Sequence, residues 1–211
     1  MTRLSLVLVA RLLLLSLAAC FPMLVTAAEP YREDVIKAAF LYRFTGYMEW
    51  PAEALKGDSF TIAVIGGNSV ADELNKLNAQ HAIKNLPIRV RSIDAARQAI
   101  DVQILYVGPQ YTGNVQQLTE SLATLPILIV TDLPSGLDDG GTVNFMIVDR
   151  RVRFEVSLAA AQRAGIKVSS ELLAVAARVR GSSLLSDPGC VPALKSFDSF
   201  SSCIERVAAA L

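Results

Sequence analysis

Between residues 60 and 131, short apolar runs alternate with amphipathic stretches of helical length. Strands are predicted at 60–65 (FTIAVI), 88–92 (IRVRS), 102–107 (VQILYV) and 127–131 (ILIVT), and helices at 69–77, 94–100 and 115–122. Most of these strands are apolar at nearly every position, which is typical of a parallel sheet covered by helices on both faces. The pattern therefore predicts an α/β fold with three layers, Rossmann-like or flavodoxin-like, and a mostly parallel sheet.

The second half of the chain departs from this rhythm. A turn-rich loop at 133–141 precedes two predicted strands, 142–148 and 151–157, which Asp149 and Arg150 join as a hairpin. The second strand alternates apolar and charged positions, which indicates one solvated face, so we expect an antiparallel hairpin near the edge of the sheet. A helix is predicted near 158–164, ending at Gly165, and another from a Ser169 cap to Gly181.

An aromatic-rich stretch at 33–51 precedes the first of these strands. Its apolar residues recur at helical spacing up to Trp50 and Pro51, which predicts a helix with a wide apolar face. We expect Phe40, Phe44 and Tyr47 mostly in the core. Tyr42 and Trp50 lie off the main stripe or at its end, so they are the candidates for contact with a partner protein.

Residues 1–28 have the features of a secretory signal peptide: two arginines, a leucine-rich apolar stretch and the small residues 26–28. Two alternatives remain open. Leu17-Ala18-Ala19-Cys20 resembles a lipobox, in which Cys20 is lipidated and tethers the protein to a membrane. An uncleaved anchor is disfavoured by the cost of Arg11 within a membrane span. Each reading places the domain outside the cytoplasm, in the periplasm or tethered at its membrane.

The predicted organisation is thus a signal peptide (1–28), an α/β domain (29–181) and a C-terminal extension (182–211). The whole chain has 20 basic and 20 acidic residues and no basic run, which excludes an electrostatic footprint for nucleic acid. Removal of residues 1–28 takes away two arginines and leaves a mildly acidic protein.

Cys190 and Cys203 are the two cysteines that remain after such cleavage. In an oxidising compartment an even count predicts a disulfide, which here closes a short loop in the extension and contributes about 3 kcal/mol by the loop-entropy argument. Free thiols or a metal pair are the alternatives. They are weaker, because the chain has no CxxC motif and its only histidine, His81, is distant in sequence.

Candidate chemistry in the domain is sparse. The glycine turn after residue 65 lacks both a GxGxxG fingerprint and a Walker lysine, and His81 has no nearby partner for base catalysis. Asp132, Asp138 and Asp139 match no calcium-loop spacing. We therefore predict no catalytic residues, no metal and no cofactor.

Several segments together carry a resemblance to a known family. They are KAAFLYRFTGYMEWP (37–51), FTIAVIGG (60–67), ILYVG (104–108), ILIVTD (127–132), the glycines at 140–141, and RRVRFEVSLAAAQRAGIKVSSELLAVAARV (150–179). In this order they resemble the YfiR family of bacterial periplasmic proteins. The resemblance implies a compact α/β regulator without enzymatic activity. Such a protein binds the periplasmic sensor domain of an inner-membrane diguanylate cyclase and holds it inactive, and an outer-membrane-linked lipoprotein relieves that repression.

A different class of function also remains. Open α/β sheets usually bind ligands at the carboxyl ends of their strands. A periplasmic small-ligand-binding module would therefore use the surroundings of Gly66, Gly108 and Asp132. The sequence leaves open whether the protein forms a homodimer.

Overall fold

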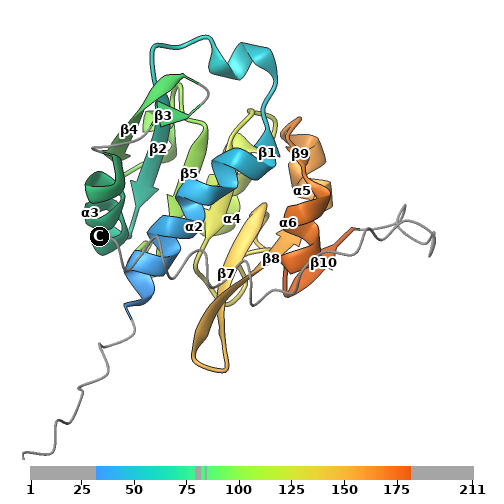
Figure 1. Cartoon of the computed structure of the whole chain (residues 1–211). Coiled ribbons are helices and arrows are strands. Elements are labelled where there is room, and N and C mark those ends of the chain that lie inside the picture. Colours follow the sequence, from blue (N-terminus) through green and yellow to red (C-terminus); the bar gives the residue numbers. More distant parts are fainter. Residues whose placement is uncertain (1–31, 79–81, 84, 182–211) are drawn as a thin grey trace, which may run out of the picture. The chain divides into compact units, whose positions relative to one another are not determined.

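The computed structural model describes residues 32–78, 82–83 and 85–181 (Figure 1). The predictions for the signal peptide, Cys20, His81, the extension and the pair Cys190 and Cys203 lie outside the described residues, so the proposed domain boundaries stay predictions. All the elements below belong to the domain that begins at Arg32.

The domain is built on an eight-stranded sheet with the order β10-β8-β7-β6-β5-β2-β4-β3. Its strands are β2 (Phe60–Ile65), β3 (Ala82–Ile83), β4 (Leu86–Ser92), β5 (Ile104–Val107), β6 (Leu128–Thr131), β7 (Val143–Val148), β8 (Arg151–Ser157) and β10 (Arg178–Arg180). Strands β4, β2, β5, β6 and β7 are parallel to one another, and in chain order they follow the flavodoxin-like sequence 2-1-3-4-5. The predicted fold class is confirmed.

Helices cover both faces of this sheet (Figure 1). They are α2 (Glu33–Tyr47), α3 (Asn68–Asn78), α4 (Val115–Leu122), α5 (Leu158–Arg163) and α6 (Ser170–Val175), with the short 3-10 helices η1 (Ala52–Leu55) and η2 (Ala96–Gln98). Alternate residues of each central strand enter different cores. Ile62 and Ile104 pack with α2, α3 and α6, whereas Ala63 and Leu105 pack with α4 and η2. The central strands are apolar throughout because both of their faces are covered.

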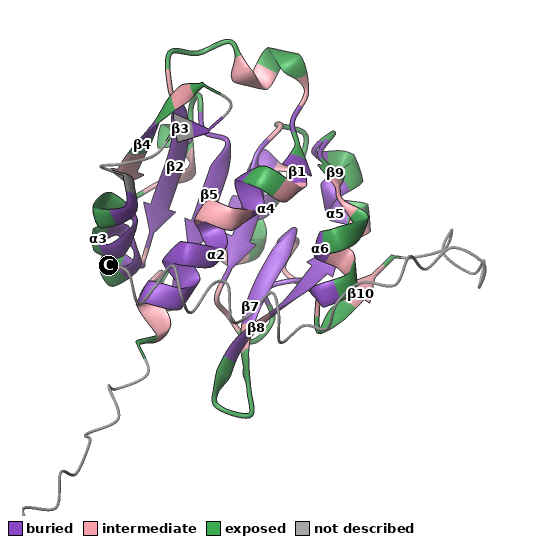
Figure 2. Cartoon of the chain, in the orientation of Figure 1, coloured by how far each residue is buried: buried purple, intermediate pink, exposed green. Residues whose placement is uncertain are grey.

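Helix α2 lies across the middle of the sheet and is the most deeply buried helix of the domain (Figure 2). Phe40 and Phe44 are fully buried, and both form edge-to-face contacts with Phe154, with ring centroids 5.4 and 5.3 Å apart. Their predicted core position is confirmed, whereas Tyr47 is only partly buried.

The predicted end of this helix at Trp50 and Pro51 is three residues too late. The helix ends at Tyr47 because the next two residues are extended and form β1 (Met48–Glu49), which pairs antiparallel with β9 (Lys167–Val168). This two-stranded sheet ties the end of α2 to the segment between α5 and α6.

The predicted hairpin is confirmed: β7 and β8 pair antiparallel through six residue pairs. Asp149 and Arg150 both have positive φ, 50° and 60°, as a two-residue type I′ turn requires. The pair lies near one edge of the sheet, with only β10 beyond it.

The predicted continuation of the last helix to Gly181 is wrong. Helix α6 begins after the Ser169 cap as expected, but Ala176 is extended (ψ 138°) and the chain then forms β10 parallel to β8. The backbone N–H of Ala177 donates to the carbonyl of Phe154 (2.8 Å). The open edge of β8 thus supplies hydrogen-bond partners that outweigh the local helical spacing of Leu172, Val175 and Val179.

Candidate functional site

The carboxyl edge of the sheet, where the ligand-binding alternative places its site, contains a buried charged cluster. Lys37 of α2 donates to Asp132, just after β6, with Nζ 2.7 Å from Oδ2, and Tyr106 of β5 donates its hydroxyl to the same oxygen at 2.9 Å. Glu33, one turn earlier in α2, lies 3.2 Å from Nζ. The side chains of Lys37 and Asp132 are only 8% and 14% exposed. This cluster therefore fixes α2 to the ends of β5 and β6.

The electrostatics of the cluster keep Lys37 charged and Tyr106 protonated at neutral pH. Burial alone would lower the pKa of Lys37, but the hydrogen bond and charge of Asp132, together with those of Glu33, outweigh burial and raise it. Burial, followed by the adjacent charge of Asp132, raises the pKa of Tyr106 well above its usual value. A lysine that stays charged and a phenol that stays protonated are not poised for proton transfer at neutral pH.

The neighbouring glycines close the point where the strand order reverses, between β2 and β5. Gly66 has φ +65°, and a Cβ added there would lie 2.2 Å from the backbone nitrogen of Tyr111. A Cβ on Gly108 would lie 2.2 Å from the carbonyl oxygen of Gly66. The N–H of Gln110 also donates to that oxygen (3.0 Å). Backbone segments thus pack in direct contact at the switch point, near which flavodoxin-like folds bind ligands.

A second buried polar row crosses β6, β7 and β8. Thr131 donates to Asn144 (2.8 Å), Asn144 donates to Glu155 (3.1 Å), and Arg178 of β10 lies 3.3 Å from Glu155. Asn144 and Glu155 are buried, so these bonds satisfy groups that would otherwise be costly to bury. The row fixes the register of the outer strands rather than forming an open site.

The remaining aspartates considered as metal ligands point to other partners. Asp138 forms an ion pair with Arg180, and the carboxylate of Asp139 accepts a hydrogen bond from Ser135. Across residues 32–78, 82–83 and 85–181, no group of three histidine, cysteine, aspartate or glutamate side chains is arranged to hold a metal ion.

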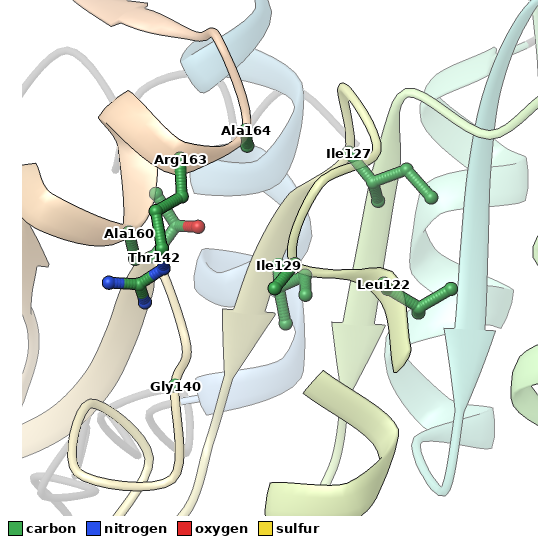
Figure 3. A pocket seen from close by; sticks show the side chains of 9 residues that line it. Leu122, Ile127, Ile129, Gly140, Thr142, Ala160, Arg163 and Ala164 are labelled. Atoms are coloured by element: carbon green, nitrogen blue, oxygen red, sulfur yellow. The ribbon is translucent and has the colours of Figure 1, made fainter. Parts of the chain in front are cut away.

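Two hollows among the described residues differ greatly in size. One lies between Leu122 of α4, Ile127 and Ile129, and Ala160 and Arg163 of α5 (Figure 3), and has a volume of about 10 Å³, room for one water molecule. The other lies at the amino edge of the sheet and measures about 870 Å³. It is lined by segments 53–59, 99–103 and 125–127 and by Thr61, Arg89 and Arg91. The second has the size of a small-molecule site, whereas the first is too small.

Exposed large apolar side chains occur in two places in the described part of the chain. Ile100 and Leu125 line the larger hollow, and Ile147 and Val148 lie at the end of β7. Strand β6 ends at Thr131, which pairs with Asn144, so the last four residues of β7 project past the carboxyl edge (Figure 2). We call residues 147–151 the hairpin tip.

The two aromatic residues predicted to contact a partner lie in different surroundings. Tyr42 is partly buried against the core. Trp50 is only 6% exposed, packs edge-on against Phe60 at a centroid distance of 5.1 Å, and donates its indole N–H to the carbonyl of Gln103 (3.1 Å). Trp50 is a core residue here, so its side chain offers little accessible surface to a partner protein.

Sequence reasoning missed the Lys37–Asp132 pair, the polar row and the hollow at the amino edge. Lys37 and Asn144 give a signal, because they interrupt otherwise apolar stretches of α2 and β7. Glu155 gives none, because it occupies the charged face of β8 that the alternation predicts to be solvated, yet it is buried. The hollow has no such signal, since loops distant in sequence form it.

Comparison with known families gives one finding. A family model described as YfiR/HmsC-like matches residues 34–177, which runs from the second residue of α2 to the residue before β10. No helix among the described residues is long and apolar enough to cross a membrane.

Proposed function

Because the chain belongs to the YfiR/HmsC-like family, we propose that it is a periplasmic regulator that binds the periplasmic sensor domain of an inner-membrane diguanylate cyclase and represses the enzyme. YfiR-type proteins are periplasmic repressors of diguanylate cyclases, and the family consists of regulatory, non-catalytic proteins. The observation that carries the proposal is the extent of the match, which includes every strand of the described domain except β10.

The proposed mechanism is differential binding. A sensor domain that exists in active and inactive states is shifted toward the state that the regulator binds more tightly. The regulator needs no reactive group for this, which agrees with a carboxyl edge whose charged side chains are buried in mutual contacts. Release of repression then requires a competitor, and we propose an outer-membrane-linked lipoprotein in that role.

We further propose that the hairpin tip contacts the sensor domain. Ile147 and Val148 are 48% and 39% exposed, and Arg150 and Arg151 lie beside them, also exposed. Exposed aliphatic side chains next to arginine are suited to interfaces, where arginine is enriched and apolar contacts form the centre. Tyr42 is a second proposed contact. Trp50 would contribute only by supporting the end of α2.

Export is part of the proposal. Residues 1–28 would direct the chain to the periplasm, with lipidation of Cys20 as the alternative, and Cys190 and Cys203 would form a disulfide there. Mass spectrometry of the protein purified from the periplasm tests all three expectations. We expect a chain that begins at Glu29 and is two hydrogen masses lighter than the fully reduced protein. A diacylglyceryl adduct on Cys20 would instead support the tethered form.

The function is tested by deleting the gene and measuring cellular cyclic di-GMP. We expect the level to rise, and we expect a membrane diguanylate cyclase to co-purify with the tagged protein from detergent-solubilised membranes. An unchanged level together with no co-purifying cyclase would refute the proposal.

A further inference from the structure

We propose that the hollow at the amino edge of the sheet binds a small organic anion with an apolar portion. This inference does not rest on repression of a cyclase, because it concerns a different edge of the sheet from the hairpin tip. The hollow has a volume of about 870 Å³, within the range of about 300 to 1,000 Å³ that is usual for small-molecule sites.

The floor of the hollow is a row of side chains across neighbouring parallel strands. Arg89 of β4 pairs with Thr61 of β2, and the N–H of Gln103, just before β5, donates to the carbonyl of Thr61 (3.0 Å). Gln103 is buried and immobilised, since its side chain accepts from the Thr61 N–H and donates to the carbonyl of Ala54, both at 2.7 Å. The floor is therefore rigid and polar.

Two arginines on one face of β4 supply positive charge to the hollow. Arg89 and Arg91 are two residues apart on one strand, so their side chains point to the same face of the sheet. Arg91 is held in place by donating to the carbonyls of Gln98 (2.8 Å) and Ile100 (2.9 Å), yet its Nε is buried without a hydrogen-bond partner. No ion pair of Arg89 occurs within the described part of the chain. Arg89 therefore retains donors for a carboxylate or phosphate, and the fixed Arg91 adds its positive charge on the same face.

The walls of the hollow supply apolar surface. Ile100 and Leu125 are 67% and 42% exposed, an unfavourable position for large aliphatic side chains unless something covers them. Asp101, between Ile100 and the floor, has φ 54°, a conformation that is uncommon for residues other than glycine. The turn that presents Ile100 to the hollow is thus strained, and such strain recurs in ligand-binding segments.

The lining also includes Glu53, Asp58 and Asp101, which would oppose an anion. Glu53 belongs to η1 and the other two acidic residues to loops, whereas both arginines come from strand β4 at the floor. We therefore expect the anionic group to lie at the floor and the apolar portion to lie against Ile100 and Leu125. Removal of an acidic side chain should then strengthen binding, because it removes a charge that opposes the anion.

The test uses 1-naphthyl phosphate as the probe, with inorganic phosphate and 1-naphthol as its two halves, in calorimetric titrations of the full exported protein. We expect saturable binding of one 1-naphthyl phosphate, with each half at least tenfold weaker. Arg89→Gln should weaken binding at least tenfold, and Ile100→Ser should weaken it as well. Asp101→Asn should tighten it, since asparagine tolerates positive φ and removes the charge.

The matched control is Arg97→Ala, which removes an exposed arginine of η2 that does not line the hollow. We expect its dissociation constant to equal that of the wild type. Thermal unfolding of each variant confirms that it is folded. The proposal is overturned if folded wild-type protein shows no saturable binding, or if Arg89→Gln and Arg97→Ala have the same affinity.

Discussion

The two ends of the parallel strands differ sharply in how they are filled. At the carboxyl edge, Lys37, Tyr106 and Asp132 form a buried cluster, and Gly66 and Gly108 allow backbone segments to pack in direct contact. At the amino edge, loops leave a hollow of about 870 Å³ with exposed Ile100 and Leu125. In a flavodoxin-like sheet the usual ligand-binding edge is the carboxyl one. Here that edge is closed by buried contacts, and we propose that recognition occurs at the amino edge and at the hairpin tip.

Among substitutions that test this difference between the two edges, Gly108→Ala should have the largest effect on the free energy of unfolding. The new Cβ would meet the backbone of Gly66 and Gly67, which cannot move without displacing β2 from β5. We expect a loss of about 3 kcal/mol or more in the free energy of unfolding, measured by urea denaturation.

Gly46→Ala is the control for that substitution, because a Cβ at Gly46, in α2, has nothing within 4 Å. We expect Gly46→Ala to stabilise the protein by about 0.5 to 1 kcal/mol. Equal small effects of the two substitutions would show that the carboxyl edge has room for a side chain, and hence for a ligand.

The next effect should come from Lys37→Met, which leaves Asp132 without its cationic partner in a mostly buried position. Removing one member of a buried ion pair leaves an uncompensated charge, and allowing for the residual exposure of Asp132 we expect a loss of about 2 kcal/mol. Lys167→Met is the control, since the side chains of Lys167 and its partner Glu49 are both exposed (83% and 72%), and its loss should cost under about 0.5 kcal/mol. Similar losses in the two variants would contradict the anchoring role of Lys37.

Changes of pH should alter the free energy of unfolding less than these substitutions do. Groups with raised and with lowered pKa should act at opposite ends of the pH range. Lys37 has a raised pKa, so its stabilising contribution is complete below its ordinary pKa of 10.5 and is lost as pH rises through the value in the folded state. Tyr106 acts in the same direction above its ordinary value of 10.0, because only the unfolded chain ionises the phenol readily. We therefore expect the unfolding free energy to fall above about pH 10, and to fall less steeply in Tyr106→Phe.

On the acid side the relevant group is Glu73. Burial alone would raise its pKa, but the hydrogen bond from Lys76 and the charges of Arg32 and Lys76 outweigh burial and lower it. Its contribution is present above the ordinary value of 4.5 and is lost as pH falls through the folded-state value. Stability that is independent of pH on both sides would mean that these pairs do not form.

The smallest effect on stability should come from the hairpin tip. Ile147→Ser with Val148→Ser changes two exposed side chains, so we expect a change in unfolding free energy within about 0.5 kcal/mol. The same double variant should fail to retain the cyclase in a pull-down from membranes. A stable variant that still retains the cyclase would move the contact elsewhere, with Tyr42 as the next position to test.

The sequence predicts the helices and strands of the α/β layers well, but it does not predict the buried contacts at the carboxyl edge. Periodicity is local, and it correctly predicts β2, α4, the β7–β8 hairpin and the burial of Phe40 and Phe44. Lys37 and Asp132 are 95 positions apart, so their contact depends on how α2 crosses the sheet. Likewise, α6 ends early because the edge of β8 offers backbone partners to Arg178–Arg180, which no local spacing signals.

The aromatic segment shows the same limit. The sequence places Trp50 at the end of an apolar stripe, where it is a candidate for partner contact. In the structure Met48 and Glu49 pair antiparallel with β9, and the indole of Trp50 lies in the core. The resemblance to the YfiR family depends on ordered segments rather than on single contacts, so it was readable from the sequence, and the match over residues 34–177 confirms it.

The most direct test of the account is cellular cyclic di-GMP in the deletion strain complemented with the wild type, with the hairpin-tip double variant or with Arg97→Ala. We predict that the wild type and Arg97→Ala return cyclic di-GMP to its original level, while the double variant, although folded and exported in equal amount, leaves it high. A deletion that does not raise cyclic di-GMP, or a double variant that represses as fully as the wild type, would contradict the account.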